Sequence, residues 1–279
     1  GELRDDGRPD FRVVRRNQFT EVTGPGGILG NASPDDPLWS VGWDYRSLIL
    51  MALDGGQWHT YRLPKGSHSY DGAHGWNTEW PRIREIGLGD DLLMTMHGTF
   101  WRFPKTFTSK TSAGIRPLSN TVKVVGDFCR WGDWVVLGCD DSAKAEFYNK
   151  RRAKGAIHGP GQSNSNLWFL RPDQLGALGP ALGRGALWFD EAVKAGEPSD
   201  PYLLTGFDRK ALALAHDAKG PVAFTLEVDL TGTGVWFPYE TYAVPPGKPL
   251  AADLSDLDGY WLRFRASAPC AATAQLRYE

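Results

Sequence analysis

The sequence predicts an all-β protein, and three observations carry the prediction. Short runs that alternate apolar and polar residues recur along the chain, and 33 Gly and 19 Pro punctuate its 279 residues. The aromatic content is high, with 12 Trp, 9 Tyr and 13 Phe. Alternation with a period of two marks a strand with one buried face, and aromatic residues are enriched in strands. No apolar pattern with helical spacing is long enough to compete.

The first two thirds of the chain contain strand-like runs joined by tight turns. Gln57–Leu63 alternates and follows D-G-G at 54–56, a sequence typical of hairpin turns. Similar runs are L-L-M-T-M-H-G-T-F-W-R-F, V-K-V-V-G-D-F-C and W-V-V-L-G-C-D. Such meanders suggest propeller blades or a sandwich, and we expect β-propeller blades over residues 1–199. The best helix signal, at 171–182, is broken by two Gly and a Pro and predicts a short helix.

From about residue 200 the strands become longer and more regular. P-V-A-F-T-L-E-V-D-L, W-F-P-Y-E-T-Y-A-V and Y-W-L-R-F-R-A-S are joined by turns of Gly, Pro and Asp. In the last run Leu262 and Phe264 alternate with Arg263 and Arg265, so one face can be buried and the other solvated. We expect a C-terminal β-sandwich-like module, or closing blades, over residues 200–279, after a boundary in A-G-E-P-S-D-P.

Composition and motifs exclude several classes of function. The formal net charge is −2 and Lys and Arg are mixed with Asp and Glu, so there is no basic field for nucleic acid or acidic lipid. No apolar run approaches the roughly 20 residues of a membrane span. There is no Walker loop, dinucleotide-binding glycine motif, H-E-x-x-H or G-x-S-x-G. The chain starts on a polar run at Gly1 without a signal peptide, and we expect a natural segment upstream.

Residues 67–85, S-H-S-Y-D-G-A-H-G-W-N-T-E-W-P-R-I-R-E, concentrate groups capable of chemistry. His68, His74 and Tyr70 can exchange protons near neutral pH, and Arg82 or Arg84 can bind a carboxylate through a bidentate fork. This combination suits cleavage beside a uronic acid.

Two other interpretations of the same stretch stay open. His68, His74 and Asp71 could ligate a divalent metal, although their spacing matches no common zinc signature, so neither a metal nor another cofactor is our expectation. The groups could also form a polar network that fixes a long loop on the blades.

Further candidates lie on strands and loops elsewhere. His97 ends a strand at Gly98, so its ring can face the core or a central cleft, and we count it among the catalytic candidates. Exposed Trp residues and loop amides suit stacking on sugar rings and hydrogen bonding to their hydroxyls. The substrate-binding candidates are Trp76, Glu79, Trp80, Trp101, Arg130, Gln162 and Asn164.

Four runs resemble bacterial β-propeller proteins of polysaccharide-degradation loci: R-R-N-Q-F-T-E-V-T-G-P-G-G, H-G-W-N-T-E-W-P-R-I-R, M-H-G-T-F-W-R-F-P-K-T-F and S-N-L-W-F. More distantly the chain is similar to seven-bladed families that include rhamnose–glucuronate lyases, ulvan lyases and a family of α-L-rhamnosidases. The resemblance covers most of residues 10–210 and concerns the scaffold. It implies a secreted or periplasmic protein, with part of the propeller upstream, since blades of roughly 40 to 45 residues need more chain.

These observations together predict a carbohydrate-active enzyme that degrades uronate- or rhamnose-containing glycans. The leading mechanism is β-elimination by a polysaccharide lyase, in which an Arg neutralises the uronate, a His removes the C5 proton and Tyr70 protonates the leaving oxygen. The alternatives are a rhamnosidase-like glycoside hydrolase on the same scaffold and a glycan-binding propeller without catalysis. The expected partner is therefore an oligosaccharide or polysaccharide.

Overall fold

The computed structural model describes residues 2–3, 6–7, 9–10, 13–66, 81–121, 123–140 and 165–279. In that part of the chain, strands dominate and the only helical segments are two short 3-10 turns, η1 (Gly27–Leu29) and η3 (Pro172–Gly176). The all-β prediction is therefore confirmed, and the helix expected at 171–182 is the single turn η3. No helix among the described residues is long and apolar enough to cross a membrane.

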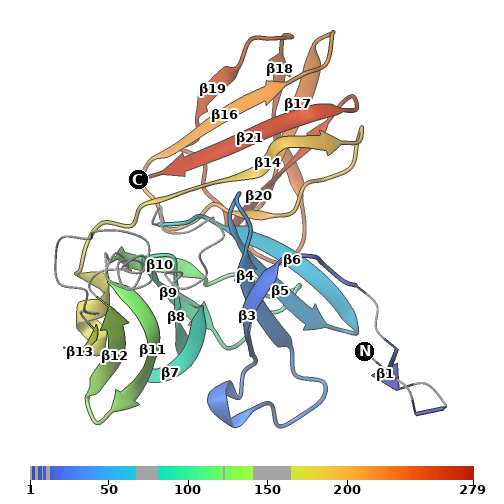
Figure 1. Cartoon of the computed structure of the whole chain (residues 1–279). Helices are drawn as coiled ribbons and strands as arrows, with labels where there is room; N and C mark the ends of the chain where they lie inside the picture. Colours follow the sequence, from blue (N-terminus) through green and yellow to red (C-terminus); the bar gives the residue numbers. More distant parts are fainter. Residues whose placement is uncertain are drawn as a thin grey trace, which may run out of the picture.

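Three antiparallel meanders form the N-terminal half (Figure 1). The first contains β3 (Gln18–Thr23), β4 (Leu38–Trp43), β5 (Leu48–Asp54) and β6 (Gln57–Leu63). The second contains β7 (Arg82–Leu88), β8 (Asp91–Met96), β9 (Thr99–Pro104) and β10 (Arg116–Asn120), and the third β11 (Val124–Trp131), β12 (Trp134–Asp140) and β13 (Ser165–Leu170). A two-stranded ribbon of β1 (Glu2–Leu3) and β2 (Pro9–Asp10) precedes them.

Up-and-down meanders of this kind are the units from which propellers are built. None of the sheets formed by the described residues closes on itself, however, and these strands do not show a propeller. What the structure supports is the coarser prediction of an all-β protein with several antiparallel sheets.

The C-terminal part contains two facing sheets, and their strands are β14 (Gly183–Val193), β15 (Tyr202–Leu203), β16 (Lys210–His216), β17 (Val222–Asp229), β18 (Phe237–Val244), β19 (Leu250–Asp253), β20 (Trp261–Ala266) and β21 (Cys270–Tyr278). One sheet has the order β14-β21-β16-β19, and the other contains β18-β17-β20-β15. Alternate residues of β16, such as Leu212 and Leu214, point into the core between them. The first sheet takes β14 from before the expected boundary at residue 200, and the boundary itself stays a prediction.

One sheet runs through both halves of the protein. The two-residue strand β15 pairs antiparallel with β20 and parallel with β6, which makes an eight-stranded sheet in the order β18-β17-β20-β15-β6-β5-β4-β3. Fully buried Arg62 of β6 reinforces this junction: its Nε donates to Asp200 at 2.9 Å and its Nη1 to Asp44 at 3.0 Å. Although burial alone would raise it, the guanidiniums of Arg62 and Arg46 hold the pKa of Asp44 below its ordinary value.

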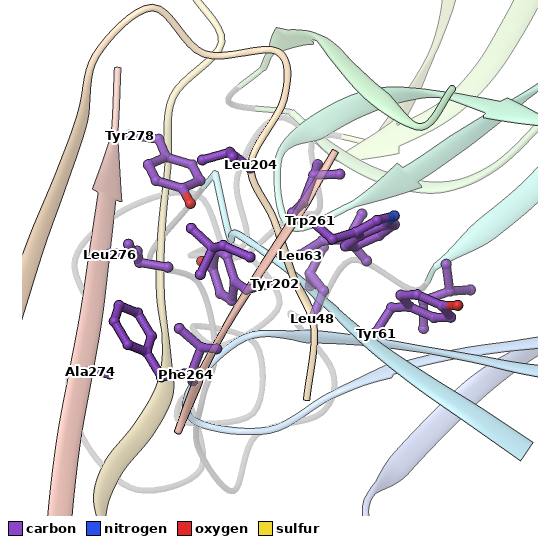
Figure 2. Close-up of a cluster of buried hydrophobic side chains, with 14 of the residues drawn as sticks. Leu48, Tyr61, Leu63, Tyr202, Leu204, Trp261, Phe264, Ala274, Leu276 and Tyr278 are labelled. Atoms are coloured by element: carbon purple, nitrogen blue, oxygen red, sulfur yellow. The ribbon is translucent and has the colours of Figure 1, made fainter. Parts of the chain in front are cut away.

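The hydrophobic core is continuous across the same junction. Figure 2 shows Leu48, Tyr61 and Leu63 of the N-terminal strands beside Trp261 and Tyr202 of the C-terminal ones. The Tyr61 and Trp261 rings have centroids 4.7 Å apart, and the Trp261 indole N–H donates to the Ser112 carbonyl. Aromatic pairs of this kind contribute beyond the area that they bury. The two halves therefore share one core.

Candidate functional site

Two of the predicted catalytic residues, Arg82 and Arg84, belong to a cluster of four charged side chains. They lie two residues apart on β7, and because strand side chains alternate, both leave the same face while Ile83 enters the core. Glu21 of β3 and Asp127 of β11 lie on either side of them. We call Glu21, Arg82, Arg84 and Asp127 the arginine–carboxylate cluster.

Glu21 is the buried member of the cluster. Its Oε1 accepts hydrogen bonds from the Ile83 amide at 3.2 Å and from Nη1 of Arg84 at 2.5 Å, and its Oε2 lies 3.8 Å from Nη1 of Arg82. Burial raises the pKa of Glu21 above its ordinary value, against the opposing effect of the two guanidiniums. Glu21 therefore holds its proton to higher pH than an exposed glutamate would.

Asp127 is held less tightly on the other side of the two arginines. Its two carboxylate oxygens each face one guanidinium, with Oδ2 at 3.3 Å from Nε of Arg82 and Oδ1 at 3.5 Å from Nε of Arg84. The side chain is 57% exposed, whereas that of Glu21 is 6% exposed. A register shift between Val125 and Asp127 marks a bulge in β11, and bulges re-aim the side chains beside them.

A hollow of about 400 Å³ adjoins the cluster. Glu21 and Arg84 form part of its wall, together with Thr23 of β3 and Asn31 beyond η1. Three glycines of the G-P-G-G-I-L-G run, Gly24, Gly27 and Gly30, also line it on the side of η1, together with Ile28. The hollow thus places two charged and two uncharged polar side chains around a space that can admit a small ligand.

The other predicted residues that the structure describes lie apart from this cluster. His97 is 1% exposed and packs its ring edge-on against Trp43, so of its two expected orientations the structure has the buried one. Trp101 is 0% exposed and belongs to the hydrophobic core, where its ring is not accessible for stacking on a sugar. Arg130 is exposed on β11, where its Nε donates to the Gly132 carbonyl at 2.9 Å.

All of the remaining predicted residues lie outside the residues that the structure describes. They are His68, Tyr70, His74, Trp76, Glu79, Trp80, Gln162 and Asn164. The predicted convergence of His68, Tyr70 and His74 with Arg82 on one pocket therefore stays a prediction. The same holds for a metal at His68, Asp71 and His74.

Glu21 is the cluster member that sequence reasoning missed. It lies in Q-F-T-E-V-T, where a single glutamate in a strand carries no signal that separates it from an exposed residue. Its partners follow 62 and 63 residues later, so only tertiary structure brings them together. Asp127 had one usable signal, namely its place beside a glycine in a strand, which is typical of a bulge.

Comparison with known proteins identifies no family. No protein-family model matches the chain, and no curated protein matches it either. Among solved structures, an exo-β-1,3-galactanase from Phanerochaete chrysosporium with galactose aligns over 94% of this chain and 69% of its own, at 8% identity and a TM-score of 0.28. PirA aligns over 36% of this chain and 86% of its own, at 10% identity and a TM-score of 0.21. At these TM-scores the function must be argued from the residues of the chain itself.

Proposed function

We propose that the protein is a carbohydrate-active enzyme that acts on acidic glycans, with Arg82 and Arg84 as the site for the substrate carboxylate. The observation that carries the proposal is the difference between the two carboxylates that flank the guanidiniums. On the buried side Glu21 accepts a short hydrogen bond from Arg84 and forms a 3.8 Å ion pair with Arg82, while exposed Asp127 faces their Nε atoms at 3.3 and 3.5 Å. The outer side of the arginine pair therefore carries an exchangeable carboxylate.

Asp127 occupies the position in which we place a uronate. One carboxylate spans both arginines there, with one oxygen to each. A uronate carboxylate has the same shape and charge, and guanidinium groups bind carboxylates through directed, charge-assisted hydrogen bonds. Because Asp127 is largely exposed, displacing it into water costs little compared with displacing a buried ion pair.

The leading reaction at this site is β-elimination. Neutralising the carboxylate by the arginines acidifies the C5 proton, which His68 or His74 removes. The electron pair of that C–H bond becomes the C4–C5 double bond as the C4–O bond breaks, and Tyr70 protonates the departing oxygen. Arg82 and Arg84 supply the electrostatic part of this scheme, and the proton-transfer residues come from the sequence prediction.

Hydrolysis is the second candidate, and the environment of Glu21 favours it. A glutamate whose pKa burial raises is suited to act as a general acid, which donates a proton to a glycosidic oxygen. Glu21 also lines the hollow beside the cluster, so a ligand there could reach it. Asp127, on the opposite side of the arginines, would then be the second carboxylate of the pair.

Product analysis decides between the candidates. Incubation with uronate oligosaccharides should give an unsaturated product with ultraviolet absorbance if the reaction is elimination, whereas new reducing ends without that absorbance indicate hydrolysis. Binding without any product would favour the glycan-binding alternative and contradict an enzyme.

A substitution of Asp127 tests the proposed carboxylate site separately. Asp127→Asn removes the competing anion, so the KM for uronate oligosaccharides should fall several-fold with the fold intact. Asp133→Asn is the matched control, because Asp133 is a more exposed aspartate on the β11–β12 turn and pairs with Arg171. An unchanged or higher KM in Asp127→Asn, with Asp133→Asn like the wild type, would contradict the proposed site.

A further inference from the structure

The outer face of the sheet β14-β21-β16-β19 forms a second hollow, with a volume of about 490 Å³. The turn between β4 and β5 borders it, since the Ala186 amide donates to the Arg46 carbonyl at 3.0 Å, and Lys65 and Arg184 exchange backbone hydrogen bonds. In Figure 1 the tip of the β4–β5 hairpin accordingly reaches the base of this sheet. We call this hollow the sandwich cleft.

Side chains on the outer face of the sheet form the floor of the sandwich cleft. Ala186, Gln275, Ala213 and Ala251 form one row across the four strands, each paired with the next. Alternation keeps the larger Leu212 and Leu276 turned toward the core between the two sheets. Ala213, Ala251 and Gln275 are exposed, whereas Ala186 is buried, so two methyl groups and one amide let a ring lie close to the sheet with a hydrogen-bonding group beside it.

The neighbouring row contains two arginines that face each other. Arg184 of β14 and Arg277 of β21 are directly paired in the register, and like charges directly opposite destabilise a sheet. Arg277 shares Glu279 with Arg209, whereas Arg184 has no ion pair among the residues that the structure describes. The described lining also includes Arg46 and Lys65 but no carboxylate. An anionic ligand between the two guanidiniums would compensate their like charges.

An aromatic pair stands at the edge of the cleft. Tyr45 is 58% exposed and Phe189 is 43% exposed, with ring centroids 6.0 Å apart at 76°. The Tyr45 hydroxyl donates to the Phe189 carbonyl at 3.3 Å, which fixes the ring over β14. Arg46, next in the chain, is anchored by ion pairs with Asp44 and Glu191. Exposed aromatic rings on a rigid support are suited to stacking against the apolar face of a sugar.

We infer that the sandwich cleft binds an acidic oligosaccharide. Arg184 and Arg277 hold a ring carboxylate, the alanine row supports the sugar ring, Gln275 contacts hydroxyl groups, and Tyr45 with Phe189 stack on a neighbouring sugar. A nucleic acid fits less well, since two exposed guanidiniums form a point site rather than a track along a backbone, and the chain has a net charge of −2. This binding function needs no turnover at the arginine–carboxylate cluster. The cleft also lies on different strands from the cluster.

Calorimetric titration of the full chain tests the inference with three probes: tetragalacturonate, the same oligosaccharide with its carboxyl groups reduced, and a thymidine oligonucleotide. We expect tetragalacturonate to bind, the reduced form to bind at least about tenfold more weakly, and the oligonucleotide to bind more weakly than tetragalacturonate. Amide resonances of Gln275 and Ala213 should shift on binding. Preference for the oligonucleotide, equal binding of the reduced sugar, or shifts confined to β3, β7 and β11 would overturn the inference.

Variants separate this site from the proposed active site. Arg184→Ala should lose about tenfold or more in affinity, the usual scale for a charge-assisted bidentate contact, and Tyr45→Ala should lose affinity as well. Arg209→Ala is the charge-matched control, because the substitution removes the same charge and Arg209, which pairs with Glu279, does not line the cleft. Turnover of short uronate substrates should be unchanged in Arg184→Ala. Equal affinity losses in Arg184→Ala and Arg209→Ala would show only a general charge effect and refute the site, whatever the result of the turnover assay.

Discussion

Two pairs of arginines in this protein have the same chemistry in opposite surroundings. Arg82 and Arg84 lie on one strand with 16% and 14% of their side chains exposed, and two carboxylates of the protein flank them. Arg184 and Arg277 face each other across two strands on an exposed sheet surface, and only Arg277 has a carboxylate partner among the described residues. Burial obliges a protein to supply its own counter-charge, whereas water can screen an exposed pair until a ligand replaces it.

The largest effect should come from removing the buried counter-charge. Glu21→Ala leaves two poorly exposed guanidiniums without their inner carboxylate and leaves the Ile83 amide without its acceptor. We expect the free energy of unfolding to fall by about 3–5 kcal/mol, the usual cost of breaking a buried ion pair. Urea denaturation measures it, with Glu197→Ala as control because Glu197 pairs with Lys194 on the surface. A loss in Glu21→Ala no larger than in Glu197→Ala would contradict the contrast between the two pairs.

A pH-dependent contribution of intermediate size should come from the same glutamate. Burial raises the folded-state pKa of Glu21 above its ordinary value of 4.5, so the folded state binds this proton more tightly than the unfolded state does. The resulting stabilisation is fully present below the unfolded pKa and is lost as the pH rises through the folded pKa. The free energy of unfolding of the wild type relative to Glu21→Gln should therefore decrease as the pH rises above 4.5.

Denaturation of both proteins across this pH range checks the sign. Asp44 does not confuse the comparison, because its pKa is held below its ordinary value of 3.8 and its contribution is lost only at lower pH. A difference between wild type and Glu21→Gln that grows with pH would show that the arginines, rather than burial, dominate the environment of Glu21.

The smallest change in stability should follow removal of an exposed arginine. Arg184→Ala ends the like-charge contact with Arg277, so the free energy of unfolding should stay within about 0.5 kcal/mol of the wild type or rise slightly. Any gain should shrink in high salt, where exposed charges are screened. Thermal denaturation at low and high ionic strength measures both effects. A loss comparable to that of Glu21→Ala would mean that Arg184 is a structural residue, and the two arginine pairs would no longer differ in kind.

The sequence predicts the local structure better than the assembly. Alternation and the D-G-G turn identify β6 over Gln57–Leu63, because both signals act between near neighbours. Nothing in the sequence shows that β15 pairs parallel with β6 or that β14 pairs with β21, since these contacts close long loops. The expected propeller rested on the recurring strand runs and on a resemblance of scaffold, and the described sheets follow the meander pattern without closing.

The same difference between local signals and long-range contacts decides which residues of the candidate sites could be predicted. Arg82 and Arg84 could be found because they share one short segment with other reactive residues. Glu21 and the Arg184–Arg277 pair could not, since each contact joins residues far apart in the chain. Trp101 is the reverse case. Its residue type alone suggested an exposed ring for stacking on a sugar, but the side chain is fully buried.

The junction at β15 affects how the protein could be divided or recombined. Cutting near residue 200 would separate Tyr61 from Trp261 and Arg62 from Asp200, and would expose both sides of a shared core. A fragment with a large apolar face tends to associate with other molecules or unfold. The C-terminal sandwich is therefore not an interchangeable cassette, and a fusion protein that is to carry its cleft must also retain the first meander as its partner.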